Sequence, residues 1–152
     1  MKKWLPLIII AVIVIGIFRW GVGLNNTMVE KQETAKTQWA NVESAYQRRS
    51  DLIPNLVSTV KGYADFERET LEAVIQARAN ATKTTIDPTN ITPEQMAAFQ
   101  ESQNSLSGAL SRLMVVVEKY PDLKANQNFL ELQSQLEVTD NRINVERNMF
   151  ND

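Results

Sequence analysis

The side chains that could do acid–base or metal chemistry here are carboxylates, because the 152 residues include neither histidine nor cysteine. Zinc sites and Ser-His or Cys-His relays are therefore excluded. Carboxylates crowd two segments, at Asp65, Glu67, Glu69 and Glu72, and again at Glu137 and Asp140. Oxygen ligands alone can bind Mg²⁺ or Ca²⁺. The sequence nevertheless has no D-x-D-x-D loop and no glycine-rich phosphate cradle.

Arginines accompany both groups of carboxylates, Arg68 and Arg78 near the first and Arg142 beside the second. Solvated charged faces and ion pairs are the simpler interpretation of such patterns. We therefore expect a protein that is not an enzyme, with no catalytic residue, no metal and no cofactor. A carboxylate-based metal site or hydrolase is kept as the third alternative.

Two polar corners suggest binding rather than catalysis. The first is RRSDLIPNLV, residues 48–57, in which Ser50 or Asp51 can cap a helix whose first turn contains Pro54. The second is YPDLKAN, residues 120–126, where Pro121 ends a helix. In an up-and-down bundle both corners reach the same end, away from the membrane. The candidate interaction surface is Arg48, Arg49, Asp51, Asn55, Tyr120, Asp122, Lys124, Asn126 and Asn128. The alternative is that these residues only cap helices and pair with one another.

Helices must position these corners, since apolar residues recur at steps of three and four. Trp39, Val42 and Tyr46 form such a stripe within residues 25–49. Similar stripes predict helices over residues 52–82, 92–120 and 123–150, with a loop at 83–92. Thr92 and Gln95 can form a capping box at the start of the third. The fold class is therefore all-α, with an antiparallel four-helix bundle of long helices.

The N-terminal segment is predicted to be a membrane helix. Residues 5–24 are apolar apart from Arg19, and Trp4 and Trp20 bracket most of them. Twenty such residues can span a bilayer, and the two tryptophans suit its interfaces. A cleaved signal peptide ending near residues 21–23 is the alternative. We divide the chain into an anchor, residues 1–24, and a helical bundle, residues 25–152.

Charge indicates orientation and argues against one class of partner. Lys2 and Lys3 favour an N-terminus inside the cell, with the body outside the cytoplasm in a single-pass arrangement. From residue 25 onward 18 acidic residues face 13 basic ones, so no nucleic-acid partner is expected.

Four stretches resemble the LemA family of bacterial membrane proteins, namely residues 48–67, 71–79, 118–137 and 140–143. The resemblance implies one N-terminal helix in the bacterial inner membrane, a mostly antiparallel four-helix bundle and no established enzymatic activity. It implies a short N-terminus outside the cell, in conflict with the charge count. Phe66 stands where the family often has histidine. Family members usually continue past the residues matching 146–151, so we expect a fragment or a shortened variant.

The functional hypothesis is a membrane-anchored module that presents its membrane-distal end to an unidentified protein partner. The alternative is a structural or envelope-stress component that self-associates into a homo-oligomer, with the apolar stripes continuing between chains as in coiled coils.

Overall fold

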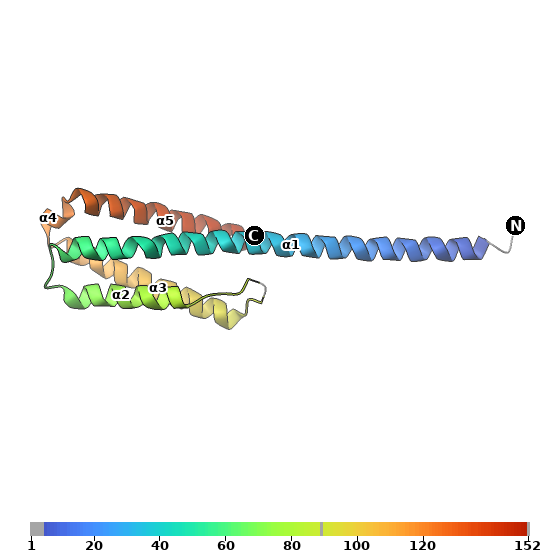
Figure 1. Ribbon diagram of the computed structural model, residues 1–152, viewed down its shortest axis with the longest axis horizontal. Coiled ribbons are helices and arrows are strands. Elements are labelled where there is room, and N and C mark those ends of the chain that lie inside the picture. The colour runs from blue at the N-terminus through green and yellow to red at the C-terminus, as the bar shows by residue number, and fades with distance from the viewer. Residues whose placement is uncertain (1–4, 89, 152) are drawn as a thin grey trace. The chain divides into compact units, whose positions relative to one another are not determined.

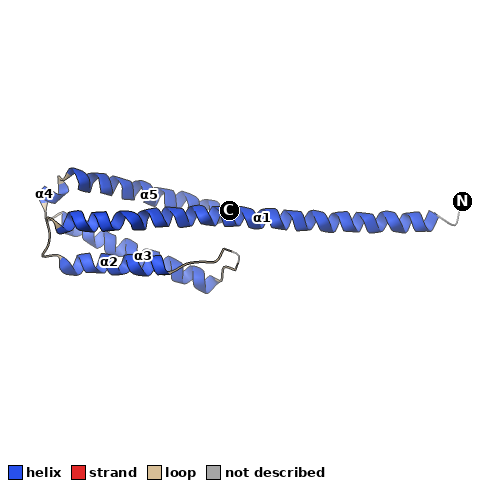
Figure 2. Ribbon diagram, in the orientation of Figure 1, coloured by secondary structure: helices blue, strands red, loops and turns tan. Residues whose placement is uncertain are grey.

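The computed structural model describes residues 5–88 and 90–151, with side chains from residue 12 onward. Its helices are α1 (Leu5–Lys61), α2 (Arg68–Lys83), α3 (Pro93–Val117), α4 (Pro121–Lys124) and α5 (Gln127–Asn151) (Figure 1). No strand occurs among the described residues, as Figure 2 shows, so the all-α prediction is confirmed. Lys2, Lys3 and Trp4, used above for orientation and anchoring, lie outside the described range.

The chain forms two compact units, residues 1–37 and 38–152, with the boundary inside α1. In the first unit, large apolar side chains from Val12 to Leu24 are exposed, including Phe18 at 71% and Trp20 at 70%. This segment is long and apolar enough to cross a membrane, judged by length and composition. The predicted N-terminal apolar helix is thus present.

The second unit has two apolar clusters. One joins Ile53 and Leu56 of α1 to side chains of α2, α3, α4 and α5, with Leu113 and Phe129 fully buried. The other is aromatic, and Trp39 is its centre, edge-on to Phe99 at 5.5 Å and to Phe150 at 5.1 Å between ring centroids. Such edge-to-face pairs add to the stabilisation that buried apolar area provides. The apolar stripes read from the sequence are therefore core positions.

Contacts within this unit show how α1 and α5 run relative to each other. Trp39, early in the bundle part of α1, contacts Phe150 at the end of α5, whereas Tyr63 just beyond α1 bonds Asn126 just before α5. The start of this part of α1 therefore contacts the end of α5, and the end of α1 lies near the start of α5, so these two helices run in opposite directions. Figure 1 shows α2, α3 and α5 beside this part of α1.

The predicted helix break at Ser50–Asp51 is wrong, because α1 continues to Lys61 with Pro54 inside it. Proline has no N–H, so the carbonyl of Ser50, four residues earlier, loses its helical partner. The side chain of Arg78 replaces it, since its Nε donates to Ser50 O at 2.8 Å. The contact from Arg78 of α2 therefore allows α1 to continue through residues 50–54, where the local sequence predicts a corner.

The actual turn between α1 and α2 covers residues 62–67. Other boundaries follow the sequence more closely. The capping box at α3 is confirmed, with the Thr92 side chain accepting from the Gln95 N–H at 3.2 Å and the Gln95 side chain accepting from the Thr92 N–H at 3.2 Å. Pro121 follows the end of α3 and starts the short α4. Asn126 then caps α5, since its side chain accepts from the Phe129 N–H at 3.0 Å.

Candidate functional site

Arg49 does not lie at a corner, contrary to the placement expected from the sequence. It is 4% exposed and sits in the middle of the bundle. Its guanidinium donates to Gln103 Oε1 at 2.6 Å, to Ser107 Oγ at 3.1 Å and to Asp140 Oδ1 at 3.3 Å. The guanidinium carbon also lies 5.3 Å from the centroid of the Tyr46 ring.

These contacts form a polar layer between the two apolar clusters. Arg49 follows Tyr46 and precedes Ile53 on α1, and Gln103 has the matching position between Phe99 and Leu106 on α3. Gln103 also donates to the Ala81 carbonyl of α2 at 3.4 Å. A buried charge is tolerated only where such partners satisfy it. The role of Arg49 is therefore to align α1, α3 and α5, and its side chain is not available to a partner.

Asp51 and Arg48 also lie within α1 rather than at its end. Asp51 accepts a hydrogen bond from Gln47 at 2.8 Å, one turn earlier on the exposed side of the helix. Arg48 is exposed and lines a different surface, described below. Asn55 and Asn128, from α1 and α5, do come together, since both line a shallow groove with Thr59.

The corner residues 120–126 meet the turn that follows α1. Asn126 donates to the hydroxyl of Tyr63 at 2.9 Å, and the hydroxyl of Tyr120 donates to Glu67 Oε1 at 3.3 Å. Partial burial, together with the nearby Glu67 carboxylate, raises the pKa of Tyr120. Two links therefore fix the turn at residues 62–67 against the α3–α4–α5 corner.

The remaining predicted residues at this corner are Asp122 and Lys124. Lys124 pairs with Glu118 at 2.6 Å between Nζ and Oε2, and Asp122 is an exposed residue in the first turn of α4. The structure thus unites Tyr120 and Asn126, which flank Lys124 in the corner, with residues 62–67. It separates them from Arg48, Arg49 and Asp51, because α1 continues for three more turns.

Phe66 is the residue that sequence reasoning missed as a candidate. It is 99% exposed, at the tip of the turn that Tyr63 and Glu67 hold. Two signals could have located this turn: Gly62, and the interruption of helical spacing between Val60 and Leu71. With Tyr63, Glu67, Tyr120, Lys124 and Asn126, Phe66 forms what we call the end surface.

One member of each set of crowded carboxylates, Glu67 in the first and Asp140 in the second, has a structural partner. Glu67 contacts Tyr120, Asp140 pairs with Arg49, and Arg142 pairs with Glu146 rather than with Glu137 or Asp140. No group of three or more Asp or Glu side chains within residues 12–88 and 90–151 is arranged to hold a metal ion.

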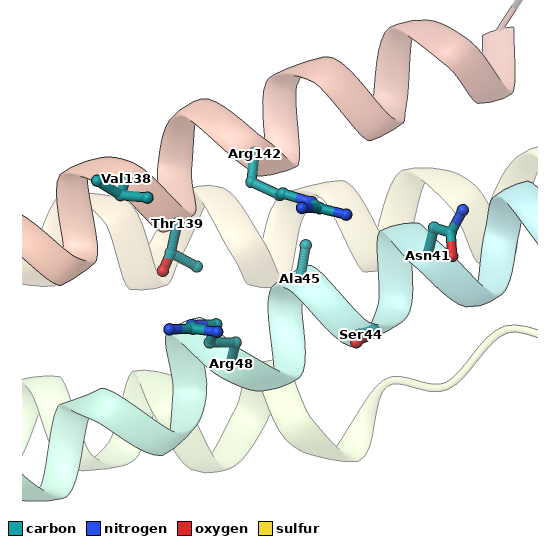
Figure 3. A pocket seen from close by; sticks show the side chains of 7 residues that line it. All are labelled: Asn41, Ser44, Ala45, Arg48, Val138, Thr139 and Arg142. Carbon is teal, nitrogen blue, oxygen red and sulfur yellow. The ribbon is translucent and has the colours of Figure 1, made fainter.

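A second surface is a groove between α1 and α5 with a volume of 340 Å³ (Figure 3). Its walls are formed by seven residues, Asn41, Ser44, Ala45, Arg48, Val138, Thr139 and Arg142. Figure 3 shows Arg48 rising from α1 and Arg142 extending from α5. We call this the α1/α5 groove.

The second unit matches a protein-family model over its whole length. The family model described as LemA family matches residues 38–152, which is also the extent of the second compact unit. Protein LemA of Metamycoplasma hominis is 27% identical over 137 residues, which cover 90% of this chain and 59% of that protein. The chain therefore spans less than two thirds of the length of that relative.

Proposed function

The chain belongs to the LemA family, and from that premise we propose that it is a membrane-anchored helical module that binds a protein partner through its end surface. The observation that carries this proposal is the 99% exposure of Phe66. Phenylalanine is among the residues that contribute most contact area when an interface buries them.

The surroundings of Phe66 support a binding role. The turn is tied to the opposite corner by Asn126 through Tyr63 and by Tyr120 through Glu67. A fixed backbone reduces the conformational entropy that binding removes, so an aromatic side chain on such a turn is preorganised for a partner. The adjacent residue Glu67 contacts Tyr120 and pairs with Lys119, and such polar groups resemble the polar rim of an interface.

Membrane anchoring is supported by the first unit. Its apolar side chains from Val12 to Leu24 are exposed around the whole helix, which leaves no polar face for water. A helix of this kind is stable when lipid surrounds it, and Arg19 near its end can extend to the headgroups.

A binding role is favoured over catalysis because the titratable groups that come together are used in structural pairs. In the Arg49–Asp140 pair the arginine is buried, and in the Arg142–Glu146 pair the glutamate is buried. Neither pair combines a nucleophile with a base that could activate it.

The test is site-specific photo-crosslinking in the native membrane, with a photoreactive phenylalanine analogue at position 66. We expect a discrete cross-linked product that identifies the partner. In a separate co-purification without cross-linking, we expect Phe66→Ala to lower recovery of the same partner about tenfold or more relative to wild type. The matched control is Val115→Ala on α3, where the valine is 67% exposed. Equal recovery with Phe66→Ala and Val115→Ala would contradict the proposal.

A further inference from the structure

The α1/α5 groove has the chemistry of a site for acidic side chains. Arg48 and Arg142 are the charged residues among those that line it, and both are basic. Arg48 is exposed and has no ion pair within the described part of the chain. Val138, 65% exposed, adds an apolar patch on the α5 wall.

The side chain of Arg142 is held in place by an ion pair on its own helix. Its Nε donates to Glu146 at 3.0 Å, and the Glu146 side chain is only 7% exposed. This contact uses one side of the guanidinium and leaves the two terminal nitrogens for another acceptor. The groove therefore fits a ligand that carries two carboxylates beside an apolar side chain.

The same chain carries such a surface on α2. Glu69, Glu72, Ala73, Ile75 and Gln76 line a shallow hollow on the exposed side of this helix. Two steps of three place Glu69, Glu72 and Ile75 on neighbouring positions of one helical face. Ile75 is 52% exposed, and neither glutamate has an ion pair within the described residues. We call this set the α2 acidic face.

We propose that the α2 acidic face of one copy docks into the α1/α5 groove of a second copy. The occupant is argued from charge complementarity: two carboxylates next to an isoleucine meet two guanidinium groups next to a valine. Self-association through the stripes of Trp39, Val42 and Tyr46 is not available, since these side chains are buried inside one unit. The contact uses neither Phe66 nor the end surface, so it goes beyond the proposed function.

The two surfaces are different patches of one chain, so the contact is heterologous. Each docked copy keeps a free groove or a free acidic face, and further copies can add. Exposed charge pairs each strengthen binding only about fivefold or less. Copies held in one membrane have a raised effective concentration, which makes a weak contact observable there.

The experiment measures energy transfer between labelled copies of the full chain in liposomes of zwitterionic lipid, as a function of protein density. Because the chain has no cysteine, Glu94→Cys gives a single labelling position at the exposed start of α3. Zwitterionic lipid keeps the charge changes from acting through membrane attraction.

We expect Arg48→Glu and Glu72→Arg each to weaken self-association about tenfold, because each turns an attraction into a repulsion. The double variant should recover wild-type association to within about threefold, since the reversed charges match again. Arg112→Glu, an exposed charge reversal on α3, is the control and should leave association unchanged.

Three results would overturn the proposal. They are energy transfer no greater than that of a monomeric membrane protein at every density, single reversals that match Arg112→Glu, and a double variant no better than the singles. Circular dichroism of each variant verifies that helix content is retained, so a loss of association cannot be assigned to unfolding.

Discussion

Two stretches of α1 are both rich in large apolar residues and differ completely in burial. In the first unit Phe18 and Trp20 are 71% and 70% exposed, whereas in the second Trp39 and Leu56 are 3% and 0% exposed. The first stretch is apolar on all sides, and the second places its apolar residues three and four apart with polar residues between them. Periodicity, more than total hydropathy, decides whether an apolar helix completes a protein core or needs lipid.

The largest expected effect is on membrane insertion of the first stretch of α1. Val14→Asp combined with Ile17→Asp places two acids in the middle of the apolar segment, at about 3 kcal/mol each against insertion. We expect the full chain to leave the carbonate-resistant membrane fraction. Val115→Asp, at a valine of similar exposure on α3, should stay there. Retention of the double variant would show that lipid does not hold this stretch.

The next effect is on the free energy of unfolding and compares a phenylalanine of the second unit with one of the first. Phe129→Ala removes a side chain that is 1% exposed and should lower the free energy of unfolding of the second unit by about 3–5 kcal/mol. Phe18→Ala should change it by less than about 0.5 kcal/mol, because Phe18 is outside that core. Urea unfolding followed by circular dichroism in the same detergent measures both. Similar losses would mean that Phe18 packs against protein.

Two adjacent arginines in the second stretch of α1, one buried and one exposed, allow the same comparison for a charged residue. Arg49→Ala leaves Gln103 buried without its strongest partner, so we expect a loss of about 1–3 kcal/mol in the free energy of unfolding. Arg48→Ala should stay within about 0.5 kcal/mol, because Arg48 is exposed. Chemical denaturation of the two variants side by side tests this, and equal losses would refute the polar layer as a buried alignment device.

A smaller effect concerns the proline that α1 accommodates. Arg78→Ala should destabilise the protein by about 1–2 kcal/mol, because Ser50 O then has no donor in place of the missing N–H. In a Pro54→Ala background a backbone N–H can bond Ser50 O, and the same change should have less than about half that effect. A double-mutant cycle measures this coupling. Additive effects would show that Arg78 does not compensate for Pro54.

The smallest effect is on pH dependence at the end surface. The pKa of Tyr120 is raised by burial and by Glu67, so folding favours its protonated form. This contribution is fully present below a pH of about 10 and is lost as the pH rises through the folded pKa. Melting temperatures measured from pH 8 to about 11 should therefore fall more steeply for wild type than for Tyr120→Phe. Parallel slopes would argue against the Tyr120–Glu67 contact.

The comparison also explains which boundaries were predictable. The α3 start was read correctly, since Thr92, Pro93 and Gln95 act on one another within a single turn. The corner at residues 50–54 was misread, because Ser50, Asp51 and Pro54 carry the same local signal and Arg78, 28 residues beyond Ser50, overrides it. Of the predicted surface, residues 120–126 do lie at a corner, and Arg49 does not.

The sequence by itself determined the all-α class, the apolar N-terminal helix and the core stripes, because helical periodicity and capping depend on residues within a few positions of one another. Only the tertiary structure decided that α1 passes Pro54, that Arg49 is buried and that Phe66 is more exposed than Tyr63, the other aromatic residue of the turn. Each of these depends on partners distant in sequence, Arg78, Gln103 and Asn126 among them, and spacing along one helix carries no information about such partners.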